Sequence, residues 1–385
     1  RRPPRSTLFP YTTLFRSAIC LAGAREALIA AERAPRVAVE TELRLAVLIA
    51  ARDEEAALPS TLATLRAQAP DQVVLVDDGS RDGSLAYLEA AWGVAFGPAD
   101  AAGVRRGVSA CWPALVVLSQ PNAGKATALN RALALAITAD VVLTMDADTS
   151  PDAGALAAVR AALAADPALD VAGGVLRPAR RPGALAAALR FFQEPEYRRS
   201  FLWRLHWERA GSLVLVSGAF AAFRTRVLAA VGGFDPHSSV EDYELLYRLH
   251  RAAADCGSHL RVRMLPQATA ITDVPTAPGA FIRQRTRWFA GFLRTLWRHR
   301  DLVGDARLGR LGRIHLRVKV VDTLLPLYGL AALVVLLVLL GSGWRPDAPI
   351  LSALAAKLLF DIGCQLWVVQ LSARWLGQRT TLRDW

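Results

Sequence analysis

The sequence is poor in cysteine and lysine and lacks the signatures of several common protein classes. Its four cysteines, in 385 residues, form no CxxC pair and have no regular spacing. This pattern argues against a disulfide-stapled scaffold and against a zinc site, and it favours a reducing compartment. No GxGxxG occurs, and Ser119 stands where a P-loop at Gly124-Lys125 would need a glycine. The sequence therefore predicts neither a dinucleotide oxidoreductase nor a P-loop NTPase.

Lysine occurs only at positions 125, 319 and 357, so the net charge of +12 comes almost entirely from arginine. Four of these arginines lie within residues 1–17, where PYTTLFRS resembles the translation of a sequencing adapter. We exclude residues 1–17 as non-native, which leaves a charge of 12 − 4 = +8. Residues 18–42 then form an N-terminal remnant, and we expect the true N-terminus, with any further membrane segment, to lie upstream.

Long apolar runs occur near the C-terminus, at Val320–Leu340 and Ile350–Leu371. Each is long enough to cross a bilayer as a helix, although the second carries Lys357 and Asp361 and could instead be re-entrant or buried against protein. Arginine is concentrated before the first run and after the second, whereas the loop between them holds only Arg345. The positive-inside rule predicts a transmembrane hairpin at 320–371 and a cytoplasmic tail at 372–385. Nucleic-acid binding is a weaker interpretation, because the charge lies beside the membrane segments rather than on a separate module.

Between Leu43 and about Leu265, short β-branched runs alternate with alanine-rich helical patterns. This βαβ order predicts an α/β fold with a mainly parallel sheet and helices on both faces. The segment Gly93–Pro113 breaks the alternation and is expected to be a loop insertion. Ligands of such sheets bind beyond the carboxyl ends of the strands. The predicted strands are 43–51, 72–78, 115–119, 140–146 and 171–175, and the predicted helices are 54–68, 84–91, 125–137 and 152–164.

Acidic residues follow three of these strands, as Asp53-Glu54, Asp77-Asp78 and Asp146-Ala147-Asp148. An extended backbone would direct the Asp146 and Asp148 side chains to the same side, where their oxygens suit Mg²⁺ or Mn²⁺. A cation there would neutralise the pyrophosphate of a nucleotide sugar. The alternatives are local: Asp148 could cap the next helix, and Asp78-Gly79 could be a simple turn.

Lys125 and the pair Glu241-Asp242 each open a predicted helix. Lys125 could place a point charge near phosphates or could be a solvated helix terminus. One carboxylate of the pair could be the general base that an inverting sugar transfer needs, because a sugar hydroxyl is a poor nucleophile at neutral pH. The alternative is a helix cap with first-turn carboxylates.

The segment Gln284-Arg285-Thr286-Arg287-Trp288 combines a guanidinium that can bind a diphosphate with an indole face on which a sugar can stack. An amphipathic interfacial helix is the alternative, and the two interpretations are compatible.

Taken in order, VLIAARDEE, VVLVDDGSRDGS, NAGKATALN, VLTMDADTSPD, SGAFAAFR, VGGFD, VEDYELLYRL and QRTRW closely resemble the inverting family-2 glycosyltransferases. The resemblance is closest to the membrane-bound branch of cellulose, chitin, hyaluronan and poly-N-acetylglucosamine synthases, and it covers roughly Leu43 to Leu371. Two departures are Asp53, where asparagine is common, and Val240, where threonine precedes Glu-Asp. The resemblance implies a GT-A-type catalytic domain at 43–275, with acceptor-side interfacial helices at 276–319.

The resemblance also implies roles for individual residues. Asp242 would be the general base, and Asp146 and Asp148 would hold Mg²⁺ or Mn²⁺. The implied donor-binding residues are Asp53, Glu54, Asp77, Asp78, Lys125, Asp146 and Arg287, and the implied acceptor-binding residues are Ser217, Gly218, Gln284 and Trp288.

Together these observations predict an enzyme of a bacterial cytoplasmic membrane, multi-pass, with its catalytic domain in the cytoplasm. We expect inverting transfer of a sugar, from a UDP-sugar, to a growing polysaccharide. One alternative is a single transfer to a lipid-linked membrane acceptor, and another is a catalytically silent membrane scaffold.

Overall fold

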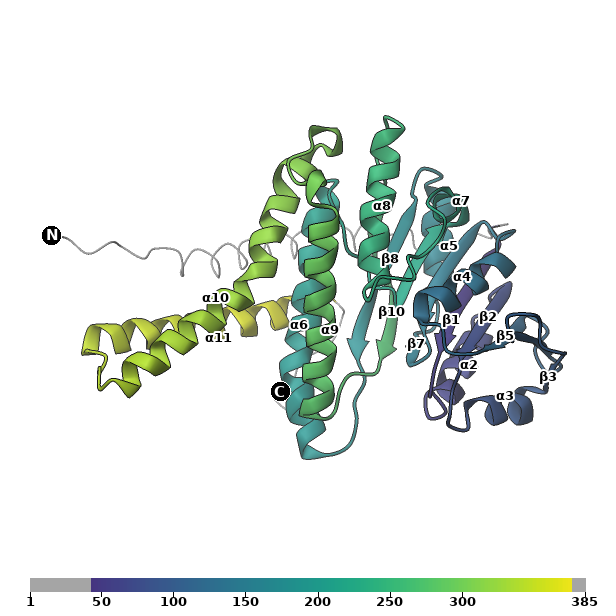
Figure 1. The fold of residues 1–385 in the computed structure, drawn as a ribbon, viewed down its shortest axis with the longest axis horizontal. Coiled ribbons are helices and arrows are strands. Elements are labelled where there is room, and N and C mark those ends of the chain that lie inside the picture. Colours follow the sequence, from purple (N-terminus) through teal and green to yellow (C-terminus); the bar gives the residue numbers. More distant parts are fainter. Residues whose placement is uncertain (1–42, 376–385) are drawn as a thin grey trace.

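A ten-stranded mixed sheet forms the centre of the fold in the computed structural model, which describes residues 43–375 (Figure 1). The adapter-like segment 1–17, the remnant 18–42 and tail residues 376–385 lie outside the described residues. Strands β1 (Leu45–Ala51), β2 (Gln72–Asp78), β5 (Leu115–Gln120) and β6 (Val141–Asp146) pair in parallel, with β1 between β2 and β6. Both faces of these strands are covered, which explains their continuous apolar sequences. The predicted parallel centre is confirmed.

The outer strands are mostly antiparallel. β3 (Val94–Phe96) and β4 (Arg105–Ser109) form a hairpin beside β5. The expectation of a loop at Gly93–Pro113 was therefore wrong: these strands are too short and too polar to give a clear periodic signal. On the other side the order is β6, β9 (Phe220–Arg224), β8 (Val171–Pro178), β10 (Val262–Thr272) and β7 (Thr149–Pro151).

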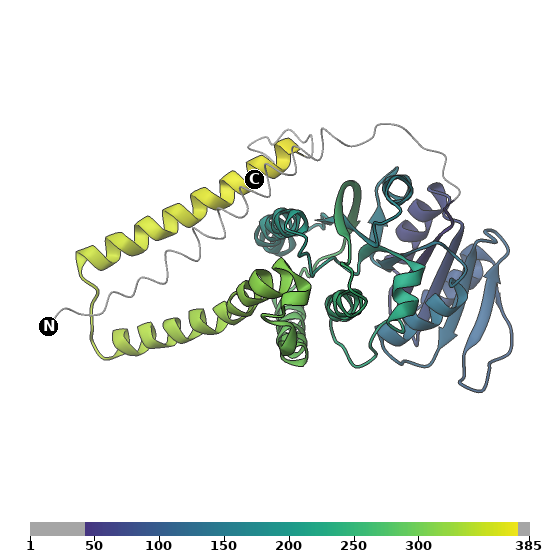
Figure 2. The same ribbon diagram turned by 90° about the horizontal axis from the view of Figure 1, so that it is seen from above.

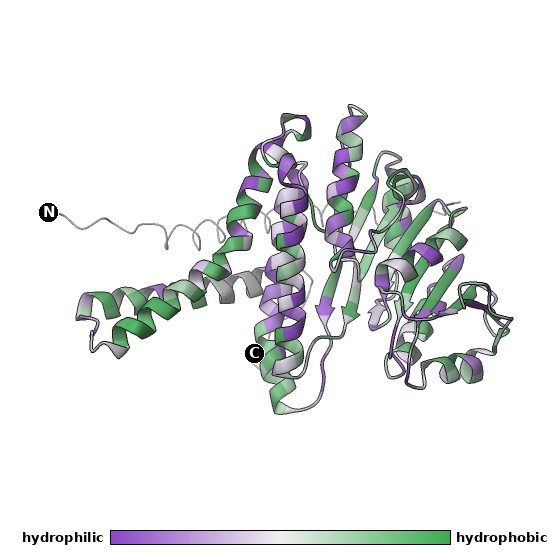
Figure 3. Ribbon diagram, viewed as in Figure 1, coloured by the Kyte–Doolittle hydropathy of each residue, from purple (hydrophilic) through white to green (hydrophobic). Residues whose placement is uncertain are grey.

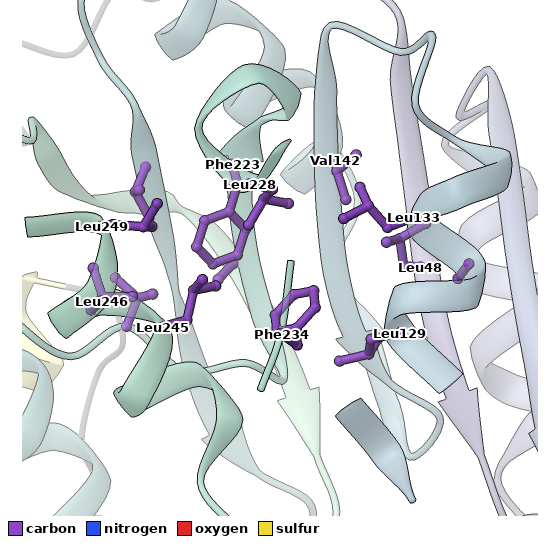
Figure 4. Close-up of a cluster of buried hydrophobic side chains, with 14 of the residues drawn as sticks. Leu48, Leu129, Leu133, Val142, Phe223, Leu228, Phe234, Leu245, Leu246 and Leu249 are labelled. Carbon is purple, nitrogen blue, oxygen red and sulfur yellow. The ribbon is translucent and has the colours of Figure 1, made fainter. Parts of the chain in front are cut away.

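Two apolar clusters hold helices against the two faces of the sheet. One packs α4 (Lys125–Leu135) and α8 (Glu241–Asp255) on β1, β6 and β9, where Leu129, Phe223 and Leu245 meet (Figure 4). The other packs α2 (Leu58–Ala67) and α5 (Ala155–Ala165) on the opposite face. The short helices α3 (Ser84–Trp92) and α7 (Thr225–Ala230) complete this domain. All four predicted helices are present, with shifted ends.

Two long helices, α6 (Ala184–Arg209) and α9 (Pro278–Arg298), stand beside the sheet and are joined by an ion pair between Arg285 and Glu196 (Figure 1). Short turns η1 (Arg300–Leu302), η2 (Ala306–Leu308) and η3 (Leu311–His315) lead to α10 (Leu316–Gly341). A third apolar cluster, which includes Tyr243, Leu296 and Leu316, packs α8, α9 and the start of α10 together. This cluster fixes α9 and the start of α10 to the helix that carries Asp242.

Helices α10 and α11 (Ala348–Trp375) extend away from the sheet and are largely apolar (Figures 2 and 3). Within the described residues, one helix is long and apolar enough to cross a membrane: the 31-residue segment Leu311–Gly341, whose apolar stretch is not buried. The second expected span, Ile350–Leu371, lies within α11, which does not meet the same criteria. The hairpin therefore stays a prediction.

Candidate active site

A cavity lies at the carboxyl ends of the strands, between the sheet and helices α6, α8 and α9. The parallel register of β1, β2 and β6 brings their carboxyl ends to one edge, as expected for a ligand site in such a sheet. The cavity collects residues from segments far apart in the sequence. The predicted site residues that line it are Lys125, Asp146, Asp148, Ser217, Asp242, Gln284, Arg287 and Trp288.

Lys125, at the first position of α4, lies between two carboxylates. Its Nζ is 2.6 Å from Asp146 Oδ1 and 2.8 Å from Glu241 Oε1. Burial acts to lower the pKa of Lys125, but the charges of Asp146 and Glu241 outweigh it and raise the pKa above its usual value. Lys125 is therefore a permanent positive charge at the strand ends rather than a solvated helix terminus.

Asp242 lies in the first turn of α8, and both its carboxylate oxygens accept backbone hydrogen bonds. The Gly218 amide donates to Oδ2 at 2.7 Å, and the Tyr243 amide donates to Oδ1 at 2.8 Å. Burial and the negative charge of Glu241 raise the pKa of Asp242, although Lys125 opposes them. Gly218 thus acts on Asp242 through its backbone and does not itself line the cavity.

Asp146 and Asp148 both line the cavity, but Ala147 and Asp148 form a turn between β6 and β7, so the expectation of an extended backbone through Asp148 was wrong. Burial and the charges of Asp146 and Asp273 raise the pKa of Asp148 to about 7. The excess of negative charge would be relieved by a cation. Among the described residues no group of three or more candidate ligands converges. Two carboxylates nevertheless fit Mg²⁺ or Mn²⁺, because such ions commonly take their other ligands from substrate phosphates and water.

The remaining predicted donor residues, Asp53, Glu54, Asp77 and Asp78, do not line this cavity. Asp78 organises the loop before α4: it accepts hydrogen bonds from the amides of Ala123 and Gly124 at 2.7 and 2.9 Å, and from two side-chain amides. Glu54 is close enough to the site for burial and the charges of Asp148 and Asp146 to raise its pKa to about 7. Asp77 is buried, and its Oδ2 has no hydrogen-bond partner within residues 43–375. A donor-binding role for these four stays a prediction.

Helix α9 contributes Gln284, Arg287 and Trp288. Arg287 Nη1 donates to the Ser239 carbonyl at 3.1 Å, and the Trp288 ring lies under the Arg285 guanidinium, 4.4 Å from its central carbon. Gln284 Oε1 is buried and has no hydrogen-bond partner in the part of the chain that the structure describes. The predicted amphipathic helix and the cavity wall are therefore the same element.

Sequence reasoning missed several residues that line the cavity, including Tyr197, Arg204, Thr272 and Asp273. Asp273 directly follows β10, so the rule that placed Asp146 would have found it had that strand been recognised. Tyr197 and Arg204 lie on α6, whose sequence gives no signal that distinguishes them from its other polar residues.

Comparisons with known proteins agree with this geometry. Residues 43–291 match the family model described as "Glycosyltransferase like family 2". A probable glycosyltransferase of Bacillus subtilis is 30% identical over 184 residues, which covers 46% of this chain and 40% of that protein. The poly-beta-1,6-N-acetyl-D-glucosamine synthase of Staphylococcus aureus is 29% identical over 174 residues, 45% of this chain and 39% of that protein. The chain thus spans less than half the length of these relatives.

Among solved structures, a mannosyltransferase from Pyrobaculum calidifontis, in complex with GDP-Man and Mn²⁺, superposes with a TM-score of 0.59 at 20% identity. The match covers 94% of this chain and 96% of that chain. At this identity the likeness establishes the fold, a mixed α/β domain of the GT-A type followed by a C-terminal apolar helix.

Proposed function

This chain belongs to glycosyltransferase family 2, and we therefore propose that it transfers a sugar, with inversion, from a nucleotide sugar to a growing polysaccharide at the cytoplasmic face of a membrane. The observation that carries the proposal is the convergence of Lys125, Asp146, Asp148 and Asp242 on one cavity at the strand ends. A fold kept only for binding has no evident need for a permanent cation, two metal-type carboxylates and a buried base together. This weighs against a silent scaffold.

The donor half of the cavity suits a nucleoside diphosphate. Asp146 and Asp148 would hold Mg²⁺ or Mn²⁺, which would supply charge neutralisation to the departing diphosphate. Lys125 and Arg287 place further positive charge on the same cavity. The Staphylococcus aureus relative is named for a polymer of N-acetylglucosamine, which supports a UDP-sugar, and the Pyrobaculum calidifontis neighbour was solved with a nucleotide sugar and Mn²⁺.

Asp242 is suited to act as the general base. As the acceptor hydroxyl oxygen bonds to the anomeric carbon, its proton passes to the Asp242 carboxylate, and the bond to the diphosphate breaks with its electron pair. Burial and the charge of Glu241 raise the pKa of Asp242 and so strengthen it as a base. The hydrogen bonds from Gly218 and Tyr243 hold its oxygens in place.

The acceptor side favours a membrane substrate. The cavity adjoins α6 and α9, and the third apolar cluster connects α8 to α10, the candidate span. A polysaccharide whose growing end lies at the membrane fits this arrangement, and so does a lipid-linked acceptor.

The test is transfer by membranes that contain the protein, supplied with a panel of UDP-sugars and Mg²⁺ or Mn²⁺. We expect metal-dependent UDP release and sugar incorporation with one donor. Asp242→Asn should lower the rate about 10²–10⁴-fold, the range typical for loss of a general base. Asp255→Asn, at the other end of α8, is the matched control and should retain activity.

Release of UDP by Asp242→Asn at the wild-type rate would contradict the assignment of the base. An absence of metal-dependent UDP release with every donor would contradict the UDP-sugar assignment. Product length would separate polymer synthesis from single transfer.

A further inference from the structure

A second cavity adjoins the first and leads from it along α6 to the start of α10. The two cavities share Glu196, Ser200, Arg204 and Leu215, so they lie side by side. Neither cavity alone, at about 200 and 180 Å³, reaches the roughly 300–1,000 Å³ typical of small-molecule sites. The second cavity is therefore best understood as an extension of the active site away from the donor.

Arg204 lines both cavities and lies where they adjoin. Within residues 43–375 its guanidinium forms no hydrogen bond or ion pair, and its Nε is fully buried. Burial lowers the pKa of Arg204, with Asp242 and Tyr197 acting in the opposite direction. Asp242 therefore acts on Arg204 through its charge but without a hydrogen bond or ion pair. Because burial of the guanidinium without hydrogen bonds costs free energy, an anionic ligand that supplied them would complete the site.

The charges around Arg204 leave a positive excess in the second cavity. The cavity is lined by Arg199, Arg204 and Lys319 and by two acidic residues. Both acidic residues are paired with cations: Glu196 accepts a hydrogen bond from Arg285 at 2.8 Å, and Asp322 lies 3.8 Å from Lys319. Within the second cavity, an anion bound at Arg204 would therefore face carboxylates that are already paired, while the charge of Asp242 acts on Arg204 from the first cavity.

The remainder of the second cavity is apolar and aromatic. Trp203, Trp207 and the segment 213–215 line it, and Trp207 has a buried indole Nε1 with no hydrogen-bond partner among the described residues. At its far end the wall is formed by Lys319 and Asp322 of α10, the one helix of the described chain that could span a membrane. The second cavity therefore combines apolar surface, two buried N–H donors without hydrogen bonds among the described residues, and the candidate membrane helix α10.

We propose that Arg204 binds a phosphate group of a lipid-linked acceptor, whose sugar hydroxyl reaches Asp242 through the first cavity while its lipid leaves beside α10. This inference rests on the proposed glycosyl transfer and specifies its acceptor. A guanidinium suits phosphate because its planar donors can form two parallel hydrogen bonds to it. An uncharged polysaccharide would offer Arg204 no anionic group to bind at this position.

The experiment compares two synthetic acceptors with the full chain in detergent. One is N-acetylglucosamine joined through a diphosphate to a short prenyl chain, and the other is the same sugar joined directly to an uncharged alkyl chain. Binding is measured by titration and transfer by product formation, for the wild type, Arg204→Met and Arg294→Met. Arg294 is the matched control because it is exposed on α9 and lines neither cavity.

We expect the wild type to bind the diphosphate acceptor at least about ten-fold more tightly than the uncharged one. Arg204→Met should lose this preference, because its Kd and KM for the diphosphate acceptor should be higher than those of the wild type. Arg294→Met should keep the preference. Because Arg204 forms no hydrogen bond or ion pair within residues 43–375, the thermal midpoint of Arg204→Met should equal or exceed that of the wild type, which a structural arginine would not allow.

Equal wild-type affinity for the two acceptors would overturn the proposal, and so would an Arg204→Met variant that keeps the preference. A water-soluble N-acetylglucosamine diphosphate without the prenyl chain is the third probe. Binding of this probe as tight as that of the prenyl form would overturn the lipid part and leave a phosphate site. If the wild type preferred the diphosphate acceptor but transferred no sugar to it, the result would count against the proposed donor chemistry and not against the acceptor site.

Discussion

Gly218 contacts the Asp242 side chain directly, and this contact fixes the position of the carboxylate. Its amide donates to Asp242 Oδ2 at 2.7 Å, and a Cβ added to Gly218 would lie 2.9 Å from Asp242 Cβ and 3.2 Å from Oδ2. Such contacts force Asp242 or the 217–218 backbone to move. The close approach explains why a glycine precedes β9, a position that sequence alone presents as one more small residue.

Gly218→Ala is therefore expected to lower the transfer rate by up to about 100-fold, because a displacement of about 1 Å at a reacting group can have that effect. The donor dissociation constant should change much less. The check is a comparison of kcat with donor binding for Gly218→Ala and for Gly279→Ala, whose added Cβ meets only Arg283 Nη1 at 3.4 Å. Equal kcat values for the two variants would refute the claim that Gly218 positions Asp242.

The elements that carry the site differ in how well the sequence predicts them. β1, β2 and β6 are continuous apolar runs with acids at or just after their ends, so the strands could be predicted, and after β6 also the position of Asp146 at the cavity. β10 contains Pro266 and shifts register between Met264 and Thr269, which hides it from a periodicity argument and with it Asp273. α6 lines both cavities, yet its contribution depends on tertiary packing that no local pattern encodes.

The geometry of the loop between β5 and α4 depends on one side chain, that of Asp78. Asp78 accepts from Gln120, Asn122, Ala123 and Gly124, and this loop delivers Lys125 to the cavity. Gly124 has φ of 91°, a conformation that favours glycine and fixes the entry into α4. Asp78 thus acts on the site through the backbone of residues 122–124.

Asp78→Asn should leave at least one of these donors facing an amide N–H, at a cost of up to about 1–3 kcal/mol where the donor is shielded from water, as that of Gln120 is. We expect a lower thermal midpoint together with weaker binding of the nucleotide sugar. Asp100→Asn is the control, because Asp100 accepts two amides at 2.8 Å in an exposed turn. Weaker donor binding without a stability loss would instead favour direct contact of Asp78 with the donor, as the resemblance implied.

On the scale of the whole molecule, the sheet domain and the apolar helices are joined by α8, α9 and the start of α10. The helix that carries Asp242, the proposed base, and the candidate span therefore belong to one packed unit. Two ionisable groups of this unit and of α6 have opposite effects on stability. Burial raises the pKa of Glu208, at the end of α6, to about 7, whereas burial lowers the pKa of His250, on α8, to about 4.

The directions of these two pKa shifts predict how the stability of the fold changes with pH. Because the folded chain holds a proton on Glu208 that the unfolded chain releases above about pH 4.5, this group makes stability fall as pH rises to about 7. His250 acts oppositely between about pH 4 and pH 6.5, because the unfolded chain binds the proton that the folded chain refuses. The two effects oppose each other up to about pH 6.5. Above this pH, Glu208 still lowers stability as pH rises, as do Asp148 and Glu54, whose pKa values are also raised to about 7.

Glu208→Gln removes the charge and keeps an oxygen that can accept the hydrogen bond from the Met264 amide, 2.7 Å from Glu208 Oε2. At about pH 8 the variant should have a higher thermal midpoint than the wild type, by about 2–4 °C for each kcal/mol in a domain of about 150–250 residues. At about pH 5 the difference should be several-fold smaller, because most of the stability loss between about pH 4.5 and pH 7 has not yet occurred. Glu89→Gln, exposed on α3, should show no such pH dependence. A midpoint gain that is the same at both pH values would mean that the Glu208 charge does not limit the stability of the fold.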